Sequence, residues 1–142
     1  TPEALAQELA QTAAALEDAG CGAPALLRPP GGLMSDEVRR QAAQAGLSLI
    51  LWNVDPEDWR GGPAQATAQH VILHAAPGAI LLLHDLQETS VTAAGQIIDA
   101  LQAQGYRFLT VSQLAAYYGK ALTPGESYRA FSPPEEPCCP AG

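Results

Sequence analysis

Apolar positions along the chain follow two patterns, which predict helices separated by short buried strands. Leu5, Leu9 and Leu16 recur at helical spacing after Thr1, whose hydroxyl can cap a helix, and Gly20 ends this run. Continuous apolar segments instead indicate fully buried strands, which we expect at residues 25–27, 47–54, 79–83 and 107–110. Further helices are expected from about Ser35 to Gly46, Gly61 to Ala75, Thr92 to Gly105 and Ser112 to Tyr118.

The alternation of strands and helices predicts an α/β fold with a parallel sheet. Four βα units correspond to half of an eight-unit barrel or to a small open doubly wound sheet, and periodicity does not separate the two. From residue 122 the apolar pattern weakens and prolines accumulate. We therefore expect a domain over residues 1–121 and a Pro-rich, extended or disordered tail over residues 122–142.

Charge and composition exclude some classes of partner. The net charge of −8 disfavours nucleic acid and anionic membrane surfaces. The longest apolar run is far shorter than the roughly 20 residues of a membrane span, so none is expected. The chain opens on Thr1-Pro2-Glu3 without an initiator Met, which suggests a processed product, an expressed fragment or one piece of a longer chain. Cys21, Cys138 and Cys139 form no CxxC pair, and no role is predicted for them.

Polar residues gather where the expected strands end. Arg28, the segment Asp55 to Trp59, and His84-Asp85 each lie at or just after the carboxyl end of a strand. In parallel α/β folds the active site is built at that edge. Three separate polar clusters at this edge therefore predict a functional site.

The residue types suggest acid–base chemistry beside an apolar wall. A histidine such as His84 donates a proton near neutral pH when a carboxylate holds it. Asp58 is the natural partner, with Asp55 and Asp85 as alternatives, and the plainer interpretation is a histidine that ends a strand. Trp59 suits either a wall for a sugar ring or acyl group, or the core.

These three segments, in this order, resemble motifs of one enzyme family. Leu27-Arg28-Pro29-Pro30-Gly31-Gly32 resembles the RPPYG motif of polysaccharide deacetylases, Asp55 to Trp59 resembles DxxDW, and Leu82-Leu83-His84 resembles LxH. The chain is thus identified as a member of the NodB homology group, carbohydrate esterase family 4. The resemblance implies the C-terminal half of a distorted (β/α) barrel.

The resemblance also implies residue roles. His84 would be the general acid that protonates the departing amine, and Asp58 would pair with it and favour its protonated form. Arg28 would orient the catalytic base. The remaining positions would serve the substrate: Trp59 and Leu82 line the acetyl pocket, and Gly31, which replaces the usual tyrosine, supplies a backbone amide to the oxyanion.

Two family motifs, TFDDGP and HSxxHP, do not occur in this sequence. They supply the base and the ligands of a divalent metal, expected to be zinc, so we expect no metal ligands in this chain. We expect the missing part upstream of Thr1, as a complementary N-terminal segment on a second chain. Without it, exposed strands would make this chain unstable.

The implied function is removal of N-acetyl or O-acetyl groups from a polysaccharide, with peptidoglycan as the expected substrate. Location at the cell envelope or outside the cell follows from the resemblance alone. Two alternatives remain: a non-catalytic carbohydrate-binding or scaffold remnant of the same family, and an unrelated small α/β domain.

Overall fold

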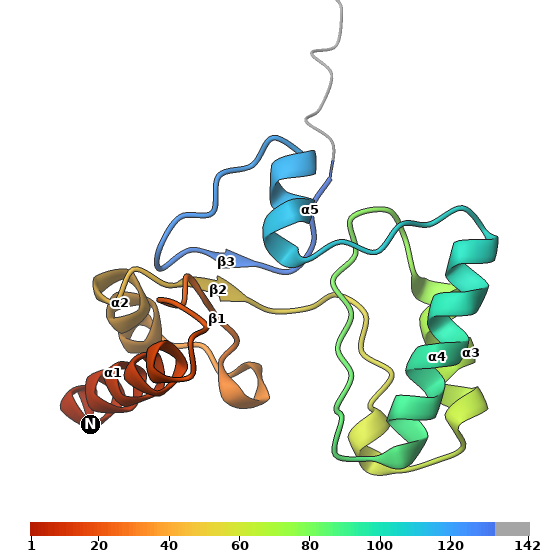
Figure 1. Ribbon diagram of the computed structural model, residues 1–142, viewed down its shortest axis with the longest axis horizontal. Helices are drawn as coiled ribbons and strands as arrows, with labels where there is room; N and C mark the ends of the chain where they lie inside the picture. Colours follow the sequence, from red (N-terminus) through yellow and green to blue (C-terminus); the bar gives the residue numbers. More distant parts are fainter. Residues whose placement is uncertain (133–142) are drawn as a thin grey trace, which may run out of the picture. The chain divides into compact units, whose positions relative to one another are not determined.

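The computed structural model describes residues 1–132, and Cys138 and Cys139 lie outside the described residues (Figure 1). The fold is α/β with parallel strand pairing, as predicted. In chain order the elements are α1 (Pro2–Asp18), β1 (Leu26–Leu27), η1 (Pro30–Gly32), α2 (Asp36–Gln44), β2 (Ser48–Ile50), η2 (Asp58–Arg60), α3 (Ala64–His74), α4 (Glu88–Ala103), α5 (Val111–Tyr117) and β3 (Ser127–Tyr128).

The described chain forms two compact units. The first contains Thr1–Asn53 and Leu122–Arg129, and the second contains Val54–Ala121 and, of the described residues, 130–132. Each unit brings together segments that are distant in sequence. We describe the two units separately.

A three-stranded parallel sheet in the order β1-β2-β3 organises the first unit. Leu27 pairs with Leu49, and Ile50 pairs with Tyr128, so β2 has a neighbour on each edge. The core beside it contains buried residues of α2, of β2 and of the position before β2, packed against partly buried apolar side chains: Ala42, Leu49 and Leu47 with Leu9, Leu27, Met34 and Val38. The buried run at residues 47–51 reflects the double-sided burial that its continuous apolar sequence predicts.

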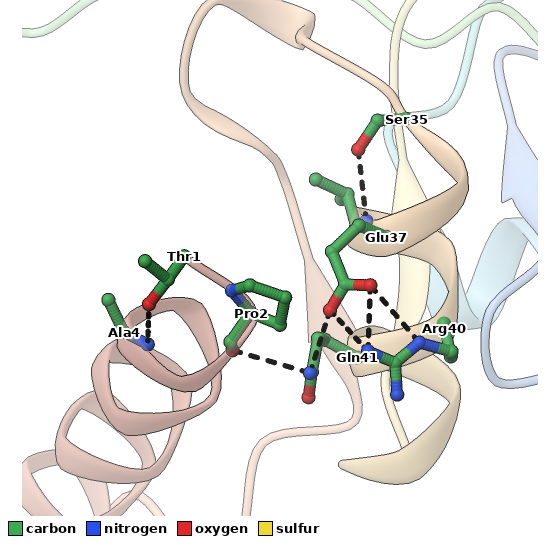
Figure 2. Close-up of polar contacts among 8 residues, drawn as sticks. Thr1, Pro2, Ala4, Ser35, Glu37, Arg40 and Gln41 are labelled. Carbon is green, nitrogen blue, oxygen red and sulfur yellow. Dashed lines mark hydrogen bonds and ion pairs between the residues drawn. The ribbon is translucent and has the colours of Figure 1, made fainter.

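Polar contacts join the beginning of α1 to α2, as Figure 2 shows. The Gln41 Nε2 group donates to the carbonyl oxygen of Pro2 at 3.3 Å and to Glu37 Oε1 at 2.9 Å. Arg40 forms an ion pair with Glu37, in which Nη2 lies 2.6 Å from Oε1. Thr1 and Ser35 cap the two helices through their side-chain oxygens, as their positions predict.

The second unit is built on a parallel bridge between Val54 and Leu81, and on the α3–α4 pair. One apolar core contains Val54, Val71 of α3, and Ile97 and Leu101 of α4. The green segment that carries residue 81 runs beside α4 in Figure 1, and Leu81 and Leu83 pack against this core.

Several expected boundaries differ from the structure. The strand expected at residues 107–110 is absent from the described chain, and β2 is shorter than expected. Residues 107–110 pair with no strand of the described chain, and a short apolar segment forms a strand only where it pairs with a neighbour. The last helix is capped by Thr110, in a capping box with Gln113, and not by Ser112.

The beginning of the segment expected to be a tail packs against the fold. Ser127 and Tyr128 form β3, and Phe131 is only 5% exposed. The Phe131 backbone N–H donates to the carbonyl oxygen of Gly78 at 2.9 Å. Residues 122–131 therefore contribute a strand to one unit and a buried aromatic ring to the other.

None of the helices within residues 1–132 is long and apolar enough to cross a membrane.

Candidate active site

The loop after Val54 places Asp58 in the interior of the second unit. Asp55 Oδ1 accepts a hydrogen bond from the Glu57 backbone N–H at 2.8 Å, which forms an Asx turn. Glu57 has a left-handed backbone with φ of 52°, and it is the only non-glycine residue with positive φ among those described. The chain then turns into η2, whose first residue, Asp58, is 4% exposed.

The same parallel bridge brings His84 to Asp58. The backbone N–H of Val54 donates to Ile80, and that of Leu82 donates to Val54, so the two segments run side by side in the same direction. Their next residues therefore leave the bridge at the same end. This is the carboxyl-end placement that the sequence predicts for a site.

Both carboxylate oxygens of Asp58 are held by His84. The His84 backbone N–H donates to Asp58 Oδ2 at 2.7 Å, and His84 Nδ1 lies 2.8 Å from Asp58 Oδ1. The Asp58 side chain is 1% exposed, whereas that of His84 is 38% exposed. The Nδ1 edge of the imidazole is thus held by a buried carboxylate, while the ring remains partly exposed at the surface.

The electrostatics of the pair define which nitrogen carries a proton. Burial pushes the pKa of Asp58 upward, but the Ser90 side chain and the hydrogen bonds from the His84 side chain and backbone outweigh it, so the pKa lies below its ordinary value of 3.8. Asp58 is therefore ionised near neutral pH and can only accept. Nδ1 of His84 must then carry the hydrogen of their shared bond, which leaves Nε2 for other chemistry.

The structure decides among the carboxylates considered as partners of His84. Asp55 uses Oδ1 to accept the Glu57 amide, and Asp85 is exposed. Among the described residues, Asp58 is the one carboxylate of the three that forms an ion pair with the imidazole. The pairing of His84 with Asp58 is as predicted.

Trp59 follows Asp58 in η2 and is 54% exposed, so it is not a core residue. The Arg60 guanidinium lies over its ring, 5.0 Å from the centroid, and Arg60 also contacts Glu57 at 3.3 Å. The indole is thus supported on the protein surface by a neighbouring cation. Such a ring offers a flat apolar surface to a ligand.

Leu82 is 7% exposed and lies between Leu81 and Leu83, which both pack against the α3–α4 core. Because side chains alternate along an extended segment, Leu82 points to the opposite face, the same face as His84 two residues later. This orientation suits the pocket-lining role that was expected of it.

Arg28 and Gly31 belong to the first unit. Arg28 Nε donates to the carbonyl oxygen of Ile50 at 3.4 Å, and its guanidinium carbon lies 5.7 Å from the Trp52 ring centroid. Burial lowers the pKa of Arg28. Within residues 1–132 Arg28 forms no ion pair. Gly31 has φ of 63°, a left-handed conformation that glycine adopts without strain.

Ser90 was missed by the sequence interpretation. The helix was expected to begin at Thr92, which left Ser90 in a loop, but α4 begins at Glu88 and holds Ser90 in its first turn, 2% exposed. Its hydroxyl contributes to the lowered pKa of Asp58. A serine two residues before an expected helix start is an ordinary capping candidate, so only its position in the fold distinguishes it.

The described residues do not by themselves fit a metal ion. Among residues 1–132 there is no group of three or more His, Cys, Asp or Glu side chains that could hold one. The Nδ1 atom of His84 is engaged by Asp58, and metal sites need several such donors together. We therefore derive no catalytic step through a metal from these residues.

Known proteins with similar sequence or structure fall in one class. The chain is 41% identical over 99 residues to a peptidoglycan-N-acetylglucosamine deacetylase of Bacillus cereus, a match that covers 66% of this chain and 46% of the relative. A T48 deacetylase solved with substrate is 36% identical, with a TM-score of 0.82, over 90% of this chain and 62% of that one. No family model matches the chain.

A third similar structure is a family 4 acetyl xylan esterase from Clostridium thermocellum in complex with a cobalt ion. It is 26% identical, has a TM-score of 0.83, and the match covers 92% of this chain and 64% of that one. Fold and site thus define part of an α/β barrel whose relatives are esterases and deacetylases of glycans. The chain is similar to polysaccharide deacetylases of carbohydrate esterase family 4 over part of their domain, and it spans about half the length of the Bacillus cereus relative.

Proposed function

We propose that this chain provides the general acid and part of the acyl-binding surface of a polysaccharide deacetylase. The observation that carries the proposal is the His84–Asp58 pair, in which a buried carboxylate holds Nδ1 at 2.8 Å while the imidazole remains partly exposed. A binding module has no need of a histidine fixed in one tautomer. A proton donor does.

In the proposed reaction, His84 acts on the tetrahedral intermediate of amide hydrolysis. Its Nε2–H transfers the proton to the amine nitrogen while the C–N bond breaks, and acetate and the free amine result. Asp58 stabilises the imidazolium that exists before the transfer and keeps the ring oriented. For an O-acetyl substrate the same proton would go to the leaving alkoxide oxygen.

We assign four further residues to binding the acetyl group and to orienting the base. Trp59 and Leu82 would contact the acetyl methyl, the Gly31 amide would donate to the oxyanion, and Arg28 would orient the catalytic base. The exposure of Trp59, and the position of buried Leu82 on the face opposite to Leu81 and Leu83, support the first of these roles.

The nucleophile's machinery is assigned to groups outside residues 1–132. We propose that a base aspartate and the ligands of a divalent metal, zinc or cobalt, lie on a complementary N-terminal segment of the barrel. The metal would activate the attacking water. The cobalt ion in the acetyl xylan esterase supports the proposal that the metal is divalent.

Peptidoglycan is the substrate we propose, because the Bacillus cereus relative, at 41% identity, is named for its N-acetylglucosamine. A protein that acts on this glycan would work at the cell envelope or outside the cell. The acidic chain, with its net charge of −8, suits no nucleic-acid partner.

The decisive experiment measures acetate release from N-acetylglucosamine polymers by this chain combined with its complementary segment, with and without Zn²⁺ or Co²⁺. We expect His84→Ala to lower the rate by about 10²–10⁴-fold, the usual contribution of a general acid. His74→Ala, at an exposed histidine of α3, is the matched control and should retain the rate. Equal rates for the two variants would remove His84 from the acid role.

A further inference from the structure

Glu57 has a backbone conformation that favours glycine. Its φ of 52° lies in the left-handed region, which is sterically unfavourable for a residue with a Cβ. The turn holds it there: its backbone N–H donates to Asp55 Oδ1 at 2.8 Å, and its carbonyl oxygen accepts from the Arg60 backbone N–H at 3.0 Å. Glycine would adopt this conformation without strain, so we expect the glutamate side chain to have a role of its own.

The Glu57 side chain contacts the side chain of Arg60. Its Oε2 lies 3.3 Å from Arg60 Nη1, between two residues that the backbone of the turn already joins. Both side chains are more than half exposed, and exposed ion pairs contribute little to stability. Stability alone therefore does not explain the arrangement. What the ion pair does fix is the position of the Arg60 guanidinium.

That guanidinium lies over the indole of Trp59. Arg60 Cζ is 5.0 Å from the ring centroid, inside the range of about 6 Å for a cation–π contact. More than half of the Trp59 surface is exposed, and an exposed side chain without such a contact samples several rotamers. Arg60 thus covers one face of the ring and restricts its direction, while the rest of the ring remains available to a ligand.

Trp59 and its neighbour Asp58 have opposite surroundings in the same turn. The Asp58 side chain is buried and held by His84, whereas Trp59 is at the surface. The Asp58–His84 pair therefore fixes where the Trp59 backbone lies. The direction of the ring is fixed separately, through Arg60.

Arg60 is not one member of a general basic surface. It is the one lysine or arginine between residues 54 and 106, a stretch that contains six aspartates and glutamates. One of those carboxylates holds it, and the one exposed tryptophan of the stretch lies beneath it. The arrangement thus combines a strained residue, an ion pair and a stacked ring directly beside the acid pair.

We propose that Arg60, held by Glu57, is a positioning residue for substrate binding: it orients the Trp59 indole so that the face opposite to the guanidinium contacts the acetylated sugar unit of the glycan. The inference rests on the proposed function for the identity of the ligand, an N-acetylated sugar, but not for the orientation of the ring. A ring that is already oriented binds more tightly, because the ligand does not have to order it.

The first test observes the stack in solution by NMR, in the chain combined with its complementary segment and isotope-labelled in this chain alone. The Arg60 Cδ protons should resonate upfield of their usual position, because the indole ring current shields groups over its face. Glu57→Gln keeps the shape of the side chain without its charge and should move them back. An unchanged Trp52 indole resonance, from the other unit, shows that the fold is intact. Ordinary Arg60 resonances in the wild type would overturn the proposal.

The second test measures binding of a short N-acetylglucosamine oligomer through the Trp59 indole resonance. We expect Arg60→Met to weaken binding about two- to fivefold, the strength of one exposed cation–π contact, since the ligand must then order the ring. Arg60→Lys keeps the cation and should stay close to wild type. Arg40→Met is the matched control: it removes an exposed arginine from a similar ion pair with Glu37 in the other unit, and it should bind like wild type.

Two results of this titration would contradict the inference. Equal affinities of Arg60→Met and Arg60→Lys would show that the cation does not position the ring. A Trp59 resonance that the oligomer leaves unmoved in the wild type would show that the ring does not contact the sugar, whatever the activity.

Acetate release then separates positioning from chemistry. Because the orientation of the ring acts on binding, Arg60→Met should raise KM and leave kcat near wild type, whereas His84→Ala is expected to lower kcat. A loss of kcat at unchanged KM in Arg60→Met would overturn the positioning role. If even the wild type releases no acetate, the proposed function fails, and the ring-current and binding measurements still decide this inference.

Discussion

At the scale of single residues, the site is organised by a carboxylate that is both buried and ionised. Asp58 is 4% exposed, which alone would raise its pKa, yet the Ser90 side chain and the hydrogen bonds from His84 lower it. The carboxylate can remain charged in the interior only because the chain surrounds it with donors. His84 is in turn fixed by two hydrogen bonds to Asp58, one from its ring Nδ1 and one from its backbone N–H.

This charge makes stability depend on pH. Because the folded pKa of Asp58 lies below its unfolded value of 3.8, its contribution is present above that value and is lost as the pH falls through the folded pKa. We expect Asp58→Asn to lower the free energy of unfolding by about 1–3 kcal/mol near neutral pH, as for a lost hydrogen bond to a charged group. The difference from wild type should shrink below pH 3.8. Urea unfolding at several pH values tests this, and a constant difference would contradict it.

At the scale of elements, short parallel contacts bring segments together without long strands. The bridge between Val54 and Leu81 is enough to bring the Asp58 and His84 loops together. The segment that carries His84 begins after a turn at Gly78, a buried glycine that the backbone of Phe131 approaches closely. The contact between Gly78 and Phe131 therefore fixes the last described residues to the start of the segment that carries His84.

Gly78 should not tolerate a side chain. It has φ of +86°, and a Cβ there would lie 1.8 Å from the carbonyl oxygen of Phe131. Gly105, after α4, has φ of +88° with nothing within 4 Å, so it isolates the cost of the backbone conformation. We expect Gly105→Ala to cost about 1 kcal/mol and Gly78→Ala about 1–3 kcal/mol more. Chemical denaturation measures both, and equal losses would show that the close approach is not present in solution.

At the scale of the whole molecule, residues 122–132 belong to the folded structure. They supply β3 to the sheet of the first unit and Phe131 to the second unit. Gly125 also packs closely on α2, where a Cβ would lie 2.7 Å from that of Ala43. Both units therefore depend on a segment whose composition indicates a tail.

A chain ended at Ala121 should consequently be much less stable than one ended at Ser132. The shorter chain loses the pairing of β3 with β2 and the buried Phe131 ring, and loss of a buried phenylalanine alone costs about 3–5 kcal/mol. Thermal unfolding followed by circular dichroism compares the two, and they differ only in residues 122–132. Equal transition temperatures would show that residues 122–132 do not stabilise the fold and that the domain ends at residue 121, as the sequence predicts.

The amino-acid sequence by itself determined the elements with strong local patterns, and it indicated His84 together with three candidate carboxylate partners. Thr1, Ser35 and the apolar run at 47–51 act locally, through capping and through burial on both faces, so they could be interpreted without a fold. The motifs around Asp58 and His84 could be recognised because they are contiguous in sequence.

Only the tertiary structure decided what depends on distant partners. A two-residue strand such as β3 has too little sequence to show a period, and it forms because β2 offers a free edge. The choice of Asp58 over Asp55 and Asp85, and the burial of Ser90, depend on where a parallel bridge directs two loops. Local sequence fixes a residue's chemistry and the conformation of its neighbours. Which groups meet, and therefore which carboxylate stays charged, is set by contacts between residues far apart in the chain.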